Sequence, residues 1–364
     1  MIFDFEILYA SSRKTLPVKS EELNKARFIY NLIPNLMKLL RELDDSTFIP
    51  TRFRKRIIPF PKRREVQIPA IRDKIVQNTL FDGYLSEDLS KPLIEETSAC
   101  IKNRGSDYAS KILKEQLRRY YKKHGNNFYA LKCDIKSYFA SIPHDKIYEL
   151  TERHIVDPKD RALVNKFVNL LKVGLALGLR QSQILANLNL SGLDHMCKEH
   201  LRAKNYGRYM DDFYIISDDY GYLLKCYHII KEYVESRGLK LNPKTKIFKN
   251  KLDFIGFTFY IKPSGKIIKV ISKSKKHSKI RHINKQLKMI KNGKLEITKF
   301  ADSYQGWRAH TKKGNNYNLI KELDQYINDY LNDIGYAMHI KVKYKKKNGI
   351  KKRSERVIIY AKNN

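Results

Sequence analysis

The stretch Tyr206-Gly-Arg-Tyr-Met-Asp-Asp-Phe-Tyr-Ile-Ile-Ser217 decides the fold of this chain. Two adjacent carboxylates, Asp211 and Asp212, are flanked on both sides by aromatic and aliphatic residues. The pattern predicts two β-strands joined by a hairpin with the acidic pair at its tip. Two like charges repel each other unless a cation neutralises them, and a bound Mg²⁺ does so. A solvated turn is the alternative, because Asp is an ordinary turn residue.

The composition of the chain points to a polyanionic partner. Its 364 residues are enough for two or three domains, and 42% of them are hydrophobic, which is enough to fill a core. Lys and Arg number 73 against 38 Asp and Glu, so the formal net charge is +35. With 24 Tyr and 16 Phe to stack on bases, nucleic acid fits better than a membrane, for which no long one-sided basic amphipathic helix is found.

Three features predict a cytoplasmic protein with no membrane partner. The first ten residues, MIFDFEILYA, carry acidic side chains where a signal peptide needs positive ones. No apolar run approaches the length that spans a bilayer. The four cysteines lack the CxxC spacing of a zinc site and suggest no disulfide framework, which is typical of a reducing compartment.

A third carboxylate stands at the end of an apolar segment. The segment 128–143, FYALKCDIKSYFASIP, predicts a strand that ends at Asp134 and a turn followed by two aromatic residues. Beside a strand that carries Asp211 and Asp212, it would complete a cluster of three carboxylates. Such hard oxygen ligands hold two Mg²⁺ ions of the kind used in phosphoryl transfer. The alternative for Asp134 is a helix N-cap, a common position for Asp.

Two further segments are candidates for contacts with a nucleic-acid strand or its phosphates. The basic segment 53–69 predicts an extended hairpin, whose Lys62 and Arg64 would grip a phosphate chain; a solvated basic turn is the alternative. The glycine-punctuated loop 174–183 opens an apolar helix, and its small residues allow a backbone to lie against a flat partner such as a base pair. A purely structural loop would look much the same.

The remaining segments show mostly helical spacing of apolar residues. A linker at 263–265 separates the segment 252–261, which predicts a pair of strands, from a basic helix and further helices that hold Trp307. The basic tail, 338–364, predicts either a hairpin around Asn348-Gly349 or a disordered arm. Other helices are predicted at 20–45, 71–81, 107–124, 144–172 and 220–238.

Taken together and in order, these motifs resemble those of reverse transcriptases. Asp134 with Phe139, the glycine-rich loop, the YMDD hairpin, and then LNPKTKI and FIGF follow one another as they do in that family. The basic hairpin resembles the fingers of bacterial group II intron-like reverse transcriptases, and SYQGWRAH resembles the start of their thumb. The resemblance extends over about residues 30–330 and argues against a solvated turn at YMDD.

The resemblance implies an α+β protein with the right-hand polymerase fold, made of fingers, an antiparallel-sheet palm and a helical thumb. It also implies an RNA-directed DNA polymerase, a nucleotidyltransferase that makes cDNA from an RNA template, a primer and dNTPs. The implied domains are the fingers and N-terminal helices at 1–127, the palm at 128–261 with 144–195 shared between fingers and palm, the thumb at 262–335 and a basic tail at 336–364.

The same resemblance implies which residues form the site. Asp134, Asp211, Asp212 and the backbone carbonyl of Ile135 would hold two Mg²⁺ ions, with Mn²⁺ as a substitute, for a two-metal nucleotidyl transfer. The other implied positions act on the incoming nucleotide: Lys62 and Arg64 on its triphosphate, Phe139 as a steric gate against ribose, Leu177, Gly178 and Gln183 in the loop, and Lys244 or Lys246 as a general acid.

The loop also indicates a subfamily. Ala176-Leu177-Gly178 and Ser182-Gln183 stand where group II intron enzymes usually have Pro-Gln-Gly and Ser-Pro, and they resemble the reverse transcriptases of diversity-generating retroelements, which copy with errors. An enzyme of an antiphage defence system or an intron-like element is the alternative, and a catalytically inactive RNA-binding protein is a further one. A structured cognate RNA and an accessory protein are the implied partners.

Overall fold

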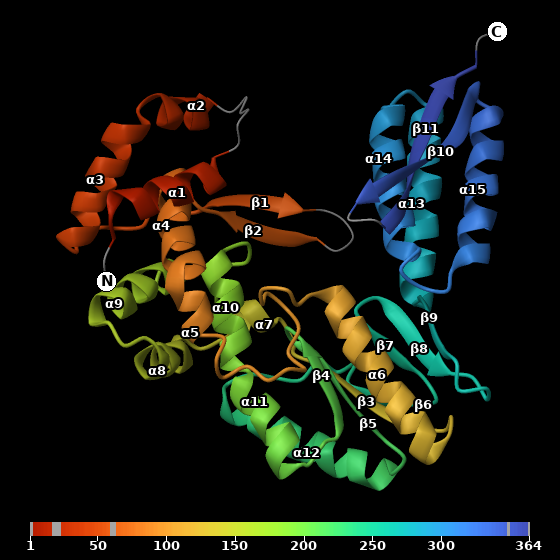
Figure 1. The fold of residues 1–364 in the computed structure, drawn as a ribbon, viewed down its shortest axis with the longest axis horizontal. Helices are drawn as coiled ribbons and strands as arrows, with labels where there is room; N and C mark the ends of the chain where they lie inside the picture. The colour runs from red at the N-terminus through yellow and green to blue at the C-terminus, as the bar shows by residue number, and fades with distance from the viewer. Residues whose placement is uncertain (1–2, 17–22, 59–62, 348–349, 363–364) are drawn as a thin grey trace. The chain divides into compact units, whose positions relative to one another are not determined.

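The computed structural model divides the chain into two compact units, Met1–Lys249 (the first unit) and Asn250–Asn364 (the second unit), shown in Figure 1. None of the helices described is long and apolar enough to cross a membrane. The structure describes residues 3–16, 23–58, 63–347 and 350–362.

The first unit begins with a group of helices and a basic hairpin. These elements are α1 (Phe5–Thr15), α2 (Leu23–Tyr30), α3 (Leu32–Asp44), β1 (Arg54–Ile58), β2 (Arg64–Ile68) and α4 (Ile71–Leu80). The helix α1 packs against α3 and α4, because apolar side chains recur on one face of each helix and bury Leu8, Leu36 and Ile75 completely. The predicted hairpin is confirmed, since Arg54 pairs with Ile68 and Ile58 pairs with Arg64.

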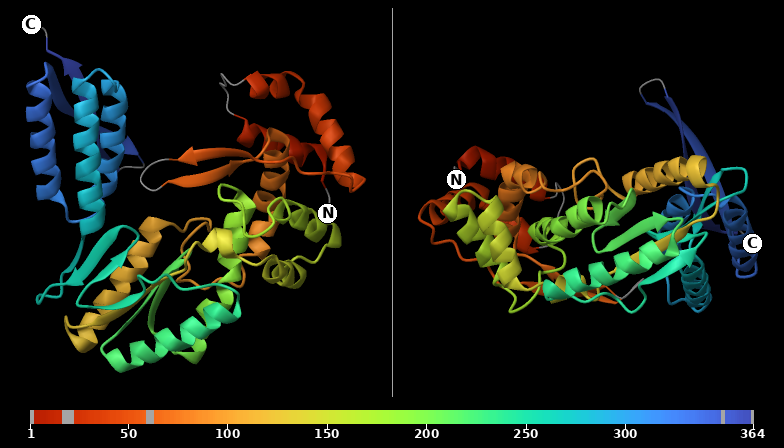
Figure 2. Two further views of the ribbon diagram at one scale, coloured as in Figure 1. Left: turned by 180° about the vertical axis from the view of Figure 1, so that it is seen from behind. Right: turned by 90° about the horizontal axis from the view of Figure 1, so that it is seen from below.

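A four-stranded antiparallel sheet forms the centre of the first unit. In the order β4-β5-β3-β6, its strands are β4 (Asn205–Tyr209), β5 (Asp212–Ser217), β3 (Tyr129–Asp134) and β6 (Lys246–Lys249). The helix α6 (Ser106–His124) covers one face and α12 (Tyr220–Ser236) the other, as the right view of Figure 2 shows. Because both faces are buried, β3 and β5 have nearly continuous apolar runs in place of alternation.

Polar contacts fix α6 to the sheet. Gln116 donates through Nε2 to the carbonyl of Tyr206 at 2.7 Å, and its Oε1 accepts from the Tyr214 hydroxyl at 2.9 Å. Gln116 and both tyrosines are almost fully buried, so each polar atom needs such a partner. The contacts set the position of the two strands that lead into and out of the acidic hairpin.

The other helices of the first unit surround this sheet and carry the glycine-rich loop. The loop runs from Gly174 to the start of α10, and a hydrogen bond from Gln67 N to Leu177 O, 2.9 Å long, joins it to β2. These elements are α5 (Ser86–Asp88), α7 (Tyr138–Ser141), α8 (His144–His154), α9 (Pro158–Val168), α10 (Arg180–Asn189), α11 (Ser191–His195) and two π-helical segments, Phe81–Leu85 and Met196–His200.

The described part of the second unit forms two small sheets and three helices. Its elements are β7 (Leu252–Phe254), β8 (Phe257–Ile261), β9 (Ile267–Ile271), α13 (Lys273–Lys291), α14 (Ile297–Thr311), α15 (Tyr317–Asn332), β10 (Tyr336–Lys347) and β11 (Ile350–Ala361). The strands β7, β8 and β9 form an antiparallel sheet, which confirms the predicted strand pair. Ile283, Leu287, Tyr304 and Leu331 form the core of the helices.

The basic tail is a hairpin and not a disordered arm. Strands β10 and β11 pair antiparallel over their whole length, from Tyr336 opposite Ala361 to Lys347 opposite Ile350. The predicted turn residues, Asn348 and Gly349, lie outside the described residues. The division of the second unit into a thumb at 262–335 and a tail at 336–364 stays a prediction.

Candidate active site

Three carboxylates meet at one end of the central sheet. Asp134 is the last residue of β3, Asp212 is the first residue of β5, and the register of the sheet places these two directly opposite each other. Asp211 precedes Asp212 in the turn that joins β4 to β5. The predicted hairpin is therefore present, but its two-residue tip is Met210 and Asp211. The expectation that both carboxylates form the tip was wrong by one residue, because Asp212 pairs with Tyr209 in the ladder.

The tip of this hairpin is a strained turn. Met210 has a φ of 59°, in the left-handed region that hairpin turns of this length use and that side chains disfavour. Its carbonyl accepts a hydrogen bond of 2.9 Å from Nη1 of Arg208. Such strain persists when the surroundings fix the backbone, and it sets the direction of the Asp211 side chain.

The support for the turn is a fully buried ionic network. Arg208 is 0% exposed and binds Asp194 through Nε at 2.7 Å and Nη2 at 2.5 Å, while Nη1 reaches Asn187 Oδ1 at 2.9 Å. Asp194 also accepts from the hydroxyls of Tyr206 and Thr97. The sequence analysis missed this network. The signal for it was a charged residue inside each of two apolar segments, since such residues are buried only with partners.

Burial controls the electrostatics of the acidic pair. Burial raises the pKa of Asp212 to about 7; the Lys132 ammonium opposes this shift, and the charges of Asp134 and Asp211 add to it. Burial, followed by the charge of Asp134, raises the pKa of Asp211 to about 6, against a lowering effect of Arg64. The site therefore disfavours negative charge until a cation is near.

Lys132 is a second residue that the sequence analysis missed. Its Nζ lies 3.1 Å from Oδ1 and 3.2 Å from Oδ2 of Asp212, but only the Oδ2 contact has hydrogen-bond geometry, so Oδ1 is buried without a hydrogen bond. Alternation along β3 could have revealed it, because residues 132 and 134 lie on the same face of a strand. The ammonium places a positive charge beside the carboxylates.

Asn242 holds the remaining carboxylate. Its Nδ2 donates to Oδ2 of Asp134 at 2.8 Å, and its backbone N–H donates to the Asp134 carbonyl at 2.7 Å. The neighbouring residues Ile135 and Leu241 form an isolated antiparallel bridge. The sequence analysis placed function in the LNPKTKI segment but assigned it to lysines. The residue of that segment that touches the site is Asn242.

The donor set fits Mg²⁺ by its chemistry, although the side chains are not gathered as a ready-made metal site. Among the residues that the structure describes, no group of three or more His, Cys, Asp or Glu side chains is placed to hold a metal ion. The carboxylates of Asp134, Asp211 and Asp212 nevertheless offer hard oxygen ligands. The charge of Asp134 raises the pKa values of Asp211 and Asp212, and the buried Oδ1 atom of Asp212 has no hydrogen-bond partner among the described residues.

The residues that we predicted to contact the nucleotide differ in burial and in their neighbours. Arg64 is near enough to Asp211 to lower its pKa, whereas Lys62 lies outside the described residues. Phe139 is partly buried and its ring stands edge-on to Tyr138 at 5.9 Å. Lys244 and Lys246 are both exposed, and the Lys246 ammonium lies 4.9 Å from the ring centre of Phe248. Their roles stay predictions.

The glycine-rich loop is held against the basic hairpin. Gly178 has a φ of 112°, and an added Cβ would lie 2.6 Å from Val66 Cγ1 and 2.9 Å from the carbonyl of Gln67, so only glycine fits. Leu177 is joined to the same strand by its carbonyl. Gln183 accepts a 3.4 Å hydrogen bond from the Cys100 thiol.

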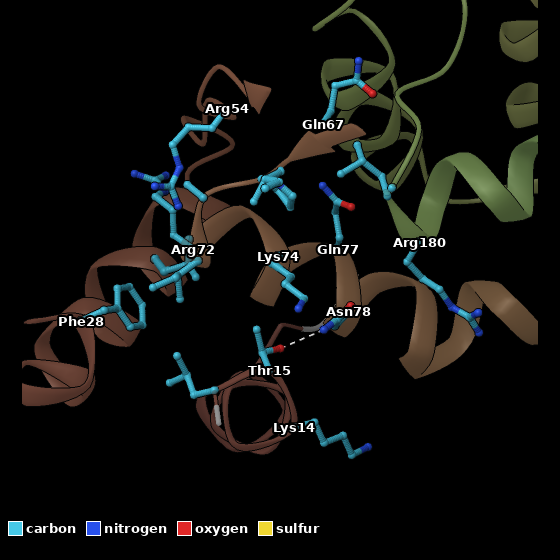
Figure 3. A pocket seen from close by; sticks show the side chains of 18 of the residues that line it. Lys14, Thr15, Phe28, Arg54, Gln67, Arg72, Lys74, Gln77, Asn78 and Arg180 are labelled. Atoms are coloured by element: carbon cyan, nitrogen blue, oxygen red, sulfur yellow. Dashed lines mark hydrogen bonds between the residues drawn. The ribbon is translucent and has the colours of Figure 1, made fainter. Parts of the chain in front are cut away.

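A cationic cavity of about 1330 Å³ lies beside this loop, among the basic hairpin, α1, α3 and α4 (Figure 3). Glu42 is the carboxylate of its lining, and Arg72 pairs with it. The side chain of Gln77 is 2% exposed, and its Nε2 has no hydrogen-bond partner among the residues that the structure describes. The lining cations that form no ion pair with any residue of known placement are Lys14, Lys38, Arg54, Arg56 and Lys74.

Comparison with known proteins gives one family and several distant structures. A family model described as reverse transcriptase (RNA-dependent DNA polymerase) matches residues 61–259. Apo telomerase from Candida tropicalis, truncated from its C-terminal domain, shares 14% identity at a TM-score of 0.46, over 65% of this chain and 60% of that one. Telomerase from Candida albicans with a fragment of telomeric RNA shares 13% identity at a TM-score of 0.48, over 79% and 62% of the two chains. No curated protein matches.

The matched region contains the whole site. It begins before Arg64, includes the glycine-rich loop and the three carboxylates, and ends in β8. The chain spans 60% and 62% of the two telomerase chains. Together with the antiparallel sheet that carries the carboxylates, the match identifies the right-hand polymerase fold. The chain belongs to the reverse transcriptase family, the RNA-dependent DNA polymerases.

Proposed function

We propose that this chain is an RNA-directed DNA polymerase that makes cDNA by two-metal nucleotidyl transfer. The observation that carries the proposal is the meeting of Asp134, Asp211 and Asp212 at one end of the sheet, with Asp134 and Asp212 directly opposite each other. The family match over residues 61–259 supports the same reaction. An RNA template, a primer end and dNTPs are the substrates.

The residues of the site have different roles in this reaction. The three carboxylates and the Ile135 carbonyl would hold two Mg²⁺ ions, which would supply positive charge beside the primer 3′-hydroxyl and the leaving pyrophosphate. Asn242 orients Asp134 through its 2.8 Å hydrogen bond. Lys132 balances the charge of Asp212 when no cation is bound.

The nucleotide is held on the side of the basic hairpin. Arg64, which acts on Asp211 electrostatically, would bind the triphosphate together with Lys62. Phe139, Leu177 and Gly178 would form the wall against the base and sugar, and Lys244 or Lys246 would donate a proton to pyrophosphate.

The cationic cavity gives the RNA strand a place to bind in the first unit. Unpaired cations bind phosphates, and the buried Gln77 amide has a hydrogen-bond donor that needs an acceptor, which a base edge provides. Glu42 is already paired with Arg72, so it does not oppose an anionic ligand. The cavity therefore suits an anionic strand with acceptors along it.

The loop favours an enzyme of a diversity-generating retroelement. Leu177 replaces a glutamine amide at the nucleotide site, and the loss of a hydrogen bond weakens discrimination between bases. The alternatives are a reverse transcriptase of an antiphage system or of an intron-like element. A cognate structured RNA and an accessory protein are part of the retroelement proposal.

Primer extension on a defined RNA template, with sequencing of the cDNA, tests the proposal. Asp211→Asn should lower the rate at least about a hundredfold, the loss typical of a removed transition-state contact, with RNA binding nearly intact. Asp218→Asn is the matched control, because Asp218 is an exposed carboxylate at the other end of β5 that pairs with His124. Equal activity of Asp211→Asn and wild type would refute the mechanism.

The cDNA sequence separates the element types. Errors concentrated opposite template adenines would support the retroelement, whereas faithful copies would favour an intron-like enzyme and untemplated repeats a defence enzyme. Absence of product from wild type, with RNA binding retained, would favour the RNA-binding alternative.

A further inference from the structure

The hairpin of β10 and β11 is a strongly basic element of the second unit. Between residues 336 and 361 the sequence has nine Lys or Arg and one acidic residue, Glu355. That carboxylate is already paired with Arg308 and Lys312. The hairpin therefore carries a large positive charge with no free acidic group of its own to balance it.

One face of the hairpin is anchored to the helices. In an antiparallel pair, opposite residues share a face and successive residues alternate between faces. Met338, Val357 and Ile359 lie on one face and pack against the core of α13, α14 and α15, with Val357 5% exposed. Gln305 of α14 fixes the edge of β11 with hydrogen bonds of 2.7 Å and 2.8 Å to the backbone of Glu355 and Val357.

The opposite face is a row of exposed cations. His339, Lys341, Lys343 and Arg356 are exposed, and none of them forms an ion pair with a residue that the structure describes. Lys341 and Arg356 are directly opposite partners, and like charges in that position destabilise a sheet. We name His339, Lys341, Lys343 and Arg356 the ribbon face. Its charges cost stability in the protein alone, which indicates a polyanionic partner.

The spacing and surroundings of the ribbon face fit a nucleic-acid backbone. Alternate residues of a strand lie about 6.6 Å apart, a repeat that suits successive phosphates along one strand. Tyr360, on the same face and 53% exposed, offers a ring that can stack on an unpaired base. A membrane would need a band of apolar side chains beside these cations. Met338, Val357 and Ile359 lie on the other face, against the helices, and Ile358, which shares the face of the cations opposite His339, is half-buried.

We infer that the ribbon face binds the phosphate backbone of RNA, through residues other than the three carboxylates. The inference rests on the proposed function for the choice of RNA as the polyanion. Because phosphate contacts carry no sequence information, the face would hold RNA of any sequence. The right view of Figure 2 shows the two strands running out past the helices of the second unit.

The test is the salt dependence of binding to a structured RNA by the full chain. The variant Lys341→Ala/Lys343→Ala/Arg356→Ala should reduce the slope of log Kd against log salt by about two to three, because each lost phosphate contact removes nearly one released counterion. The matched control is Arg153→Ala/Lys159→Ala/Lys225→Ala, which removes the same residue types from exposed positions of α8, α9 and α12. Its slope should stay near that of wild type.

A second variant guards against misfolding. Lys343→Glu changes one exposed side chain opposite Ser354 and leaves the packed face intact, so it should melt like wild type and bind RNA less tightly. An unchanged slope in the triple variant, or an equal change in the control, would overturn the inference. Loss of binding to phosphatidylserine vesicles with RNA binding retained would also overturn it, in favour of a membrane.

Primer extension separates this inference from the proposed function. On a short primer–template at saturating concentration, the triple variant should extend at the wild-type rate, since none of its changes touches the carboxylates. A reduced slope in a protein whose wild type makes no cDNA would uphold the ribbon face and refute the polymerase. Normal extension with an unchanged slope would do the reverse.

Discussion

Two β-hairpins of this chain carry like charges in opposite surroundings. The hairpin of β4 and β5 holds Asp211 and Asp212 half-buried, and this burial raises the pKa values of both carboxyls. The hairpin of β10 and β11 holds Lys341 and Arg356 directly opposite each other on an exposed face. In each hairpin the charges repel, so each is stable because something else holds it.

The difference lies in what holds each hairpin. The acidic turn depends on a buried salt bridge, Arg208 with Asp194, whose every polar atom is close to a partner. The basic hairpin depends on apolar packing of its other face and on Gln305, and water and salt screen its charges. The acidic turn is therefore held by a buried salt bridge behind it, whereas the exposed basic hairpin is held by uncharged contacts alone.

Removal of Arg208 should produce the largest effect. Arg208→Met leaves Asp194 buried without its counter-charge and frees the Met210 carbonyl, so we expect a loss of about 3–5 kcal/mol in the free energy of unfolding. Urea denaturation measures it. The double variant Arg208→Met/Asp194→Asn should recover part of the loss, because it removes the uncompensated charge. A double variant no more stable than the single one would contradict this account.

Lys279 differs from both hairpins, because its charge is buried with no counter-charge among the described residues. Lys279 of α13 is 7% exposed, forms no ion pair with a described residue, and has the Trp307 ring 6.0 Å from its ammonium. Burial lowers the pKa of its amine to about 8 from the ordinary value of 10.5. Between these two pH values the unfolded chain binds the proton and the folded chain does not, so stability should rise with pH from about 8 to 10.5.

Lys279→Met tests this third case. The variant should lose that rise and gain about 1 kcal/mol at pH 7, the lower end of the cost of a buried polar group without a hydrogen bond. Thermal denaturation at several pH values measures both effects. Lys275→Met, an exposed lysine on the same helix, is the control and should keep the wild-type pH dependence. An identical pH profile in Lys279→Met and wild type would exclude Lys279 as its source.

The smallest effect is expected on the ribbon face. Arg356→Glu turns the repulsive pair with Lys341 into an attractive one, so it should stabilise the chain by about 0.2–1 kcal/mol while it weakens RNA binding. Chemical denaturation and filter binding measure the two changes. Arg356→Ala removes the repulsion without adding attraction and should lie between wild type and Arg356→Glu in stability. A less stable Arg356→Glu would show that the pair is not in repulsion.

Much of the site could be predicted from short-range pattern. Asp134 at the end of an apolar run and the acidic pair between two apolar runs indicated strand ends, and the structure places all three carboxylates at one edge of a sheet. The predicted position of the turn was wrong by one residue. Met210 adopts a left-handed backbone conformation, which residues other than glycine rarely do, so no sequence signal marked it as a turn residue.

The supporting residues could not be predicted, because their partners are distant in the chain. Arg208 of β4 meets Asp194 of α11 over 14 positions, and Asn242 reaches Asp134 over 108 positions. Lys132 was within reach of the alternation argument, but its partner Asp212 depends on the register between β3 and β5. Register follows from the packing of whole strands, and no local motif encodes it.

The charge of the molecule, its family and the three carboxylates that we propose as metal ligands follow from the amino-acid sequence alone, because composition and ordered motifs are properties of the chain. The tertiary structure decided which charges are buried, which partners compensate them, and which face of the basic hairpin is exposed. These are free-energy choices between burial and hydration, and they depend on contacts between residues that are far apart in the sequence.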